Sequence, residues 1–160
     1  ASDQPALGGV YKLAALRNSN GEWDYKIKLS EQAIKINTPG IQQVRRYKGP
    51  QGFIADMIYN IEMPPAEHPL MTDPLDFTKR RSFEDDGNYE DLLVEIYDKG
   101  TLTYSLPTIT AIKARVKEQV DSLHSSIKRF ANPHLYPVGL EEQLFDLKTA
   151  LILQLRNQSK

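Results

Sequence analysis

Lys12 and Lys28 are the residues whose type and spacing best suggest chemistry, because a predicted β-hairpin brings them together. The hairpin joins an apolar run at 9–17 to an alternating run at 23–29. A three-residue turn that ends with Gly21 in the left-handed conformation is a common connection of this kind. Counting outward from that turn sets the two lysines opposite each other.

The predicted hairpin has one basic face, which carries Lys12, Lys26 and Lys28 with Ser30 beside them. Tyrosine and aliphatic side chains occupy the other face, as a half-buried sheet requires. Two ammonium groups that lie opposite each other are mildly destabilising unless they separate into water or an anion lies between them. The basic face is therefore either a solvated surface or a site for an anion such as a phosphate.

The other charged residues form no recognisable site, so we predict no catalytic and no metal-binding residue. The three histidines lack metal-ligand spacing: His68, His124 and His134. The acidic cluster Glu84-Asp85-Asp86, with Glu90-Asp91 after it, lacks the ordered spacing of a calcium loop and indicates a solvated turn. Arg45-Arg46-Tyr47-Lys48 mixes basic and aromatic residues as single-strand binders do, but one short patch favours an exposed strand end.

The composition is that of a globular domain, with 160 residues of which 40% are hydrophobic and 26% charged. The chain contains no cysteine, which excludes disulfides and thiolate sites and fits a cytoplasmic location. No apolar run is long enough to span a membrane. The net charge is +4 over residues 1–48, −8 over residues 49–107 and +3 over residues 108–160, so we expect neither a nucleic acid nor a membrane as partner.

The first two thirds of the chain predict antiparallel β-hairpins, and the last third predicts helices. Beyond the first hairpin, strands are expected at 41–47 with 53–59, at 92–97 with 101–104, and at 77–83. Apolar residues then recur every three or four positions from Ile109 to Ile127, after a possible N-cap at Thr108, and again from Leu140 to Leu155. We expect both stripes to pack into the core. Strands followed by two C-terminal amphipathic helices indicate an α+β fold.

Several segments resemble nicotinate phosphoribosyltransferases. The opening Asp3-Gln4-Pro5-Ala6-Leu7-Gly8-Gly9-Val10-Tyr11-Lys12-Leu13 resembles the segment that follows the phosphate-binding glycine turn of these enzymes. The likeness continues through five further segments: Ile27-Lys28-Leu29-Ser30-Glu31, Thr38-Pro39-Gly40, Lys128-Arg129-Phe130 with Asn132-Pro133, Tyr136-Pro137-Val138, and Asp146-Leu147-Lys148. It covers nearly the whole chain but only the C-terminal part of the enzyme. We therefore interpret the chain, which begins with Ala1 rather than methionine, as a fragment without most of the catalytic barrel.

This resemblance implies the reaction of the whole enzyme. Nicotinate and phosphoribosyl pyrophosphate yield nicotinate mononucleotide and pyrophosphate, with ATP hydrolysis, in NAD salvage. The resemblance also implies ATP and magnesium as cofactors, a homodimer with active sites between subunits, and a phosphorylated histidine in the upstream barrel. We expect the fragment alone to be inactive and to bind no cofactor, and its partner to be the missing N-terminal barrel portion.

The resemblance also suggests phosphate-binding residues. In the related nicotinamide phosphoribosyltransferases, lysines in matching strands reach phosphates across the dimer interface, and these positions match Lys12, Lys28 and Lys35, with Ser30 as a weaker candidate. Residues 1–38 would be the final strands of the barrel and dimer-interface region, and residues 39–160 a C-terminal accessory domain. The alternative is a non-catalytic structural or interaction domain whose lysines are solvated.

Overall fold

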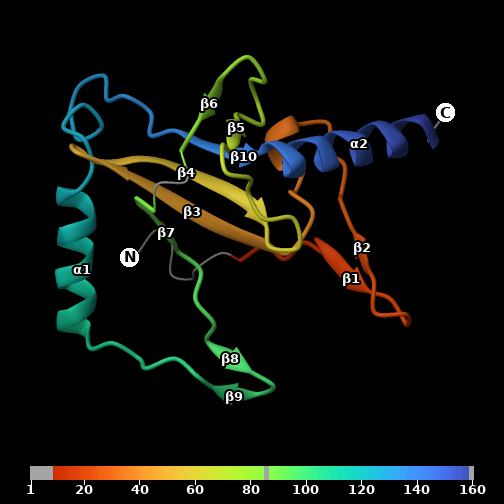
Figure 1. The fold of residues 1–160 in the computed structure, drawn as a ribbon, viewed down its shortest axis with the longest axis horizontal. Helices are drawn as coiled ribbons and strands as arrows, with labels where there is room; N and C mark the ends of the chain where they lie inside the picture. Colours follow the sequence, from red (N-terminus) through yellow and green to blue (C-terminus); the bar gives the residue numbers. More distant parts are fainter. Residues whose placement is uncertain (1–8, 85–86, 159–160) are drawn as a thin grey trace, which may run out of the picture. The chain divides into compact units, whose positions relative to one another are not determined.

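A computed structural model describes residues 9–84 and 87–158 (Figure 1). These residues fall into two compact units. One unit comprises residues 9–41 with 146–158, and the other comprises Gln42–Phe145. The elements in chain order are β1 (Ala15–Arg17), β2 (Trp23–Tyr25), η1 (Ala33–Lys35), β3 (Gln42–Gly49), β4 (Gly52–Asn60), β5 (Leu70–Thr72), β6 (Arg80–Ser82), β7 (Tyr89–Asp91), β8 (Tyr97–Asp98), β9 (Thr101–Leu102), α1 (Ile109–Asp121), β10 (Val138–Glu141) and α2 (Glu142–Gln158).

The first predicted hairpin is confirmed in its turn and in its register. β1 pairs antiparallel with β2, so that Ala15 faces Tyr25. The backbone N–H of Asn18 donates to the carbonyl of Glu22 at 2.9 Å, which closes the turn. Gly21 has φ of +84°, the left-handed conformation that this turn requires. The strands are shorter than predicted, because the regular pairing covers only three residues on each side.

A six-stranded mixed sheet forms the second unit, in the order β6-β5-β10-β4-β3-β7. The predicted second hairpin is confirmed as β3 and β4, and β6 lies within the predicted strand region 77–83. The predicted third hairpin is present as β8 and β9, but β8 includes only Tyr97 of the expected strand 92–97. The sequence analysis missed β10, which inserts between β4, as a parallel neighbour, and β5, as an antiparallel one. A Cβ on Gly139 of β10 would lie 2.8 Å from the Thr72 carbonyl oxygen, so glycine permits this close approach.

The hydrophobic core of this unit is built mainly from side chains of the sheet strands. Its buried members come from β3, β4, β5 and the segment after β6: Tyr47, Ala55, Met57, Met71 and Phe83. The rings of Tyr47 and Phe83 stack with centroids 3.9 Å apart. Strands and helices are largely segregated along the chain, with only β10 between α1 and α2, so this is an α+β fold, as predicted.

Helix α1 begins where the sequence predicts, but its apolar stripe does not pack into a core. The Thr108 side chain accepts a hydrogen bond from the Ala111 N–H at 3.2 Å, which confirms the N-cap. The helix ends at Asp121, before the predicted end. The expectation of core packing is wrong for this helix, since its apolar side chains are exposed: Ile109 73%, Ile112 47%, Val116 57% and Val120 47%.

The C-terminal end of α1 is held by the first residues of β4. The Phe53 N–H donates to the Ser122 carbonyl at 2.9 Å. Gly52, which has φ of +102°, allows this approach, because a Cβ there would lie 2.0 Å from the Ser122 oxygen. The helix is thus attached at one end, while the part of the chain that the structure describes leaves its apolar face exposed.

Helix α2 begins two residues later than its predicted apolar stripe, since Leu140 belongs to β10. The Glu141 carboxylate accepts hydrogen bonds from the backbone N–H groups of Gln143 and Leu144, at 2.9 and 3.2 Å, and so caps the first turn. Burial raises the pKa of Glu141, and these two hydrogen bonds oppose the shift. Leu144 is fully buried, which confirms the predicted core packing at that position, whereas Leu147, Leu151 and Leu155 of the same stripe are only partly buried.

Candidate anion-binding site

All the candidate phosphate-binding residues line one cavity of about 760 Å³ in the unit formed by residues 9–41 and 146–158. Among the described residues, its polar lining consists of Lys12, Lys26, Lys28, Ser30 and Lys35, with no aspartate or glutamate. The apolar lining comes from the same two chain segments: Val10, Tyr11, Leu13, Ile27 and Leu29. The cavity combines an apolar wall with four ammonium groups, which suits a ligand with phosphate groups.

Asn37 determines the shape of this cavity by separating the two strand extensions. Regular pairing ends at Ala15 and Tyr25. Beyond it, the Asn37 side chain accepts from the Lys28 N–H at 2.6 Å and donates to the Leu13 carbonyl at 3.2 Å. Lys12 and Lys28 therefore do not form a backbone pair as the register predicts, yet both still line the same cavity.

The lysines of the cavity differ in how their charge is balanced. The Lys26 ammonium lies 2.5 Å from the Asp24 carboxylate. The Lys12 ammonium donates to the carbonyl of Lys35. Within residues 9–84 and 87–158, no carboxylate lies within ion-pair distance of Lys12, Lys28 or Lys35. These three ammonium groups leave the site positively charged and available to an anion.

The sequence analysis missed a further lysine, Lys148 of α2. Its ammonium donates to the Ile36 carbonyl at 3.5 Å and to the Thr38 hydroxyl at 3.3 Å, all within the same unit. Burial lowers the pKa of Lys148, and the positive charge of Lys12 lowers it further. The sequence contains a signal that could have identified Lys148. Its neighbours three and four positions away along the helix are all apolar: Leu144, Phe145, Leu151 and Ile152.

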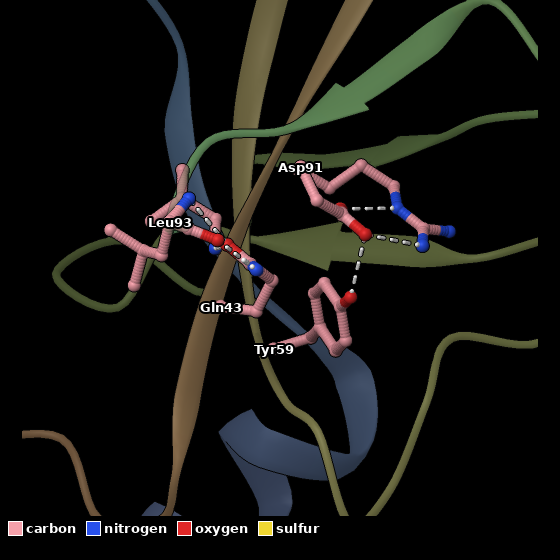
Figure 2. A network of polar contacts seen from close by, with 6 residues as sticks. Gln43, Tyr59, Asp91 and Leu93 are labelled. Carbon is pink, nitrogen blue, oxygen red and sulfur yellow. Dashed lines mark hydrogen bonds and ion pairs between the residues drawn. The ribbon is translucent and has the colours of Figure 1, made fainter. Parts of the chain in front are cut away.

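The basic residues of β3 are engaged in ion pairs within the sheet instead. Arg45 donates two hydrogen bonds to the Asp91 carboxylate, at 3.0 and 3.2 Å, and Tyr59 donates a third at 3.0 Å (Figure 2). Lys48 lies 2.7 Å from Glu90. Glu90 and Asp91 thus neutralise Lys48 and Arg45. The expectation of an exposed strand end is wrong, because β3 lies between β4 and β7, the side chains of Arg45 and Arg46 are 12% and 17% exposed, and Tyr47 is buried. Asp85 and Asp86 lie outside the described residues.

A second contact in the same network anchors the chain after β7. The side chain of Gln43 donates to the Leu93 carbonyl and accepts from the Leu93 N–H, both at 2.9 Å (Figure 2). Arg45 also lies over the Tyr89 ring, with the guanidinium carbon 3.8 Å from its centroid. Gln43 and Arg45 thus tie β3 to β7 and to the segment that follows it.

Comparison with known proteins agrees with the resemblance seen in the sequence. Residues 41–148 match the family described as nicotinate phosphoribosyltransferase C-terminal domain. The chain belongs to this family. The nicotinate phosphoribosyltransferase of Bacillus subtilis is 31% identical over 99% of this chain, and that of Caenorhabditis elegans is 34% identical over 94%. The crystal structure of human nicotinic acid phosphoribosyltransferase matches 72% of this chain with a TM-score of 0.63 and 25% identity.

The nicotinate phosphoribosyltransferase relatives are much longer than this chain. The matched region is 33% of the Bacillus subtilis protein, 27% of the Caenorhabditis elegans protein and 24% of the human chain. The chain therefore spans about a third of its relatives or less, as expected of a C-terminal portion. Of the opening motif, residues 3–8 lie outside the described part.

Two of the three histidines of this chain, His124 and His134, line one cavity of about 490 Å³ in the sheet unit. His68 is exposed and lies 2.9 Å from Glu84, and His124 lies 2.8 Å from the Ser126 hydroxyl. In the part of the chain that the structure describes, no group of three or more His, Asp or Glu side chains is placed to hold a metal ion. No described helix is both long and apolar enough to cross a membrane.

Proposed function

We propose that this chain is the C-terminal portion of an enzyme that converts nicotinate and phosphoribosyl pyrophosphate, with ATP hydrolysis, to nicotinate mononucleotide and pyrophosphate. The printed names of the relatives and the match of the C-terminal domain support the proposal. In this reaction the ring nitrogen of nicotinate bonds to C1 of the ribose while the bond from C1 to pyrophosphate breaks. Negative charge leaves with the pyrophosphate, so the enzyme needs positive groups where that anion lies.

This chain would supply some of those positive groups. The observation that carries this part of the proposal is the cavity lined by Lys12, Lys28 and Lys35, whose ammonium groups have no carboxylate within ion-pair distance among the described residues. Each ammonium can donate three hydrogen bonds and is a compact charge suited to phosphate oxygens. The Ser30 hydroxyl, which lines the same cavity, would add a neutral donor.

The same proposal includes the cofactors and partners of the whole enzyme. ATP would be its cofactor, and its phosphates fit the cationic lining of the cavity. Magnesium would accompany the nucleotide, held by phosphate oxygens and by groups outside this chain. We further propose a cytoplasmic homodimer in which the lysines of one subunit serve the active site of the other.

Inorganic pyrophosphate is the simplest probe of the cavity. Lys12→Ala and Lys28→Ala should each weaken its binding about ten- to a hundredfold, the value of a hydrogen bond between charged groups. Binding is measured on the 160-residue chain by following backbone amide signals in NMR spectra as pyrophosphate is added.

Lys26→Ala is the matched control, because Lys26 lines the same cavity but its ammonium is paired with Asp24. The control should bind pyrophosphate within about twofold of the unmodified chain. Equal losses in all three variants, or no loss in any, would contradict a specific site at Lys12 and Lys28.

The 160-residue chain alone should form no nicotinate mononucleotide from nicotinate, phosphoribosyl pyrophosphate and ATP. The reason is that the phosphorylated histidine and the glycine turn expected of the family belong to the barrel portion. Product is measured by chromatography of the reaction mixture, with the Lys12→Ala chain as the blank. Turnover above that blank would show that the reaction needs no barrel portion.

A second candidate function, that of a non-catalytic interaction domain, is favoured by the exposed apolar side chains between β7 and the end of α1. Besides those of α1, they include Leu93, Val94, Tyr97 and Leu106. A surface of this kind in a soluble protein usually contacts a partner. In the enzyme, that partner would be the barrel portion. A chain that does not bind pyrophosphate but does bind a partner through α1 would favour the second candidate.

A further inference from the structure

Lys148 holds a positive charge where the chain itself does little to stabilise it. The side chain is half-buried, and its two hydrogen-bond acceptors, the Ile36 carbonyl and the Thr38 hydroxyl, are both neutral. No carboxylate of the described residues lies within ion-pair distance of it. A partly buried ammonium without a counter-ion is unfavourable, since burial removes water that would otherwise solvate the charge.

A second ammonium lies close to it. Lys12 donates to the carbonyl of Lys35, and Lys148 donates to the carbonyl of the next residue, Ile36. The two lysines thus approach the same short segment from residues far apart in the sequence. Their like charges repel, and the repulsion is greater than in bulk water because Lys148 is partly desolvated.

We propose that Lys148 is a further cation of the anion-binding site, and that a phosphate anion held at Lys12 offsets the repulsion between the two ammonium groups. The inference rests on the proposed function, since it assumes that Lys12 binds phosphate, and it adds a residue that lies outside the cavity lining. It also gives α2 a part in the site. The helix would bring to the anion a charge that neither strand of the hairpin supplies.

The charged groups around Lys148 determine how its protonation depends on pH. Lys12 comes from the segment before β1, and Lys35 from η1, while the positions three and four residues away on α2 are apolar. The folded chain holds the pKa of Lys148 below its usual 10.5, first by burial and then by the charge of Lys12. A bound anion would raise the pKa of Lys148. At a pH between the lower pKa of the free chain and the higher pKa of the complex, anion binding should therefore be accompanied by proton uptake at Lys148.

The test compares pyrophosphate binding by the unmodified chain and by Lys148→Met, from pH 7.5 to pH 10.5. At the lower pH, Lys148→Met should bind about fivefold more weakly, the effect of one nearby charge. As the pH rises and Lys148 loses its proton, this difference should disappear. Titration of free pyrophosphate is the same for both proteins, so it cancels in the ratio of the two affinities.

Lys148→Arg keeps the charge and should bind as the unmodified chain does at pH 7.5. If Lys148→Met folds poorly, NMR of the Lys148 side chain in the unmodified chain replaces it, and its pKa should rise when pyrophosphate is added. A loss in Lys148→Met that is the same at every pH, or an unchanged pKa of Lys148, would overturn the inference. If Lys12→Ala weakens binding and Lys148→Met does not, only this inference fails. If Lys12→Ala has no effect, the proposed phosphate site at Lys12 fails as well.

Discussion

Replacing Asp56 with alanine should lower the free energy of unfolding by about 3–5 kcal/mol, as expected when one partner of a buried ion pair is removed. Asp56 of β4 is 8% exposed. Arg46 of β3 donates two hydrogen bonds to its carboxylate, at 2.8 and 2.7 Å. Asp56→Ala leaves that guanidinium partly buried with no compensating charge. Unfolding in urea, followed by circular dichroism, gives the free energy.

The effect should be large because Asp56 joins several elements of the sheet unit. The Tyr136 hydroxyl donates to Asp56 at 2.9 Å, and Arg46 also donates to the Gln119 side chain of α1 at 2.6 Å. Burial raises the pKa of Tyr136, and its hydrogen bond to Asp56 raises it further, so the phenol remains a donor at ordinary pH. Losing Asp56 therefore leaves both Tyr136 and Arg46 without their shared acceptor.

Glu90→Ala is the matched control for this prediction. Glu90 pairs with Lys48 of the same strand β3, but both side chains are about two-fifths exposed. An exposed pair contributes about 0–1 kcal/mol, so this variant should unfold close to the unmodified chain. Equal losses of unfolding free energy in Asp56→Ala and Glu90→Ala would mean that the Arg46–Asp56 pair is as accessible to water as the exposed Lys48–Glu90 pair.

Local signals in the sequence predicted the hairpins, because a turn and an alternating run are properties of neighbouring residues. Gly21 and the run at 23–29 were sufficient for the first hairpin and its register. β10 was missed because its four residues contain a glycine and run directly into α2. Its partners, β4 and β5, are distant in sequence, and only the folded sheet brings them together.

The apolar stripe of α1 shows a different limit. Spacing of three and four residues tells which face of a helix is apolar, but it does not tell what covers that face. The stripe on α1 is exposed, whereas Leu144 on α2 is buried, although both follow the same period. The difference lies in the rest of the fold: α1 is attached to the sheet at its C-terminal end, whereas α2 continues directly from a central strand.

The candidate anion-binding site was also predictable from the sequence only in part. Lys12 and Lys28 could be proposed from the register of one hairpin, because they are sixteen residues apart on adjoining segments. Their separation by the Asn37 side chain could not be foreseen, since it depends on hydrogen bonds to both strands. The apolar neighbours of Lys148 on its helix mark it as unusual, but they do not show what it contacts, since Ile36 and Thr38 lie more than a hundred residues away in the sequence.

Leu144→Ala should lower the free energy of unfolding by about 2–5 kcal/mol, the range for a fully buried leucine. Leu144 is 0% exposed in the first turn of α2. Alanine would leave a cavity there and remove the burial of the isobutyl group. The measurement is again unfolding in urea. An unchanged slope of the unfolding free energy against urea concentration would show that unfolding exposes the same surface area in the variant.

Val116→Ala on α1 separates burial from helical periodicity as the cause of that loss. Val116 occupies the same kind of position in an apolar stripe, yet it is 57% exposed. Its replacement should change the free energy of unfolding by no more than about 0.5 kcal/mol, because alanine removes few contacts and favours the helix. A loss at Val116 as large as that at Leu144 would mean that α1 is covered in solution, either by the sheet unit or by a second chain. Repeating the measurement at lower protein concentration distinguishes these two, because the loss of stability in Val116→Ala becomes smaller on dilution only if a second chain covers α1.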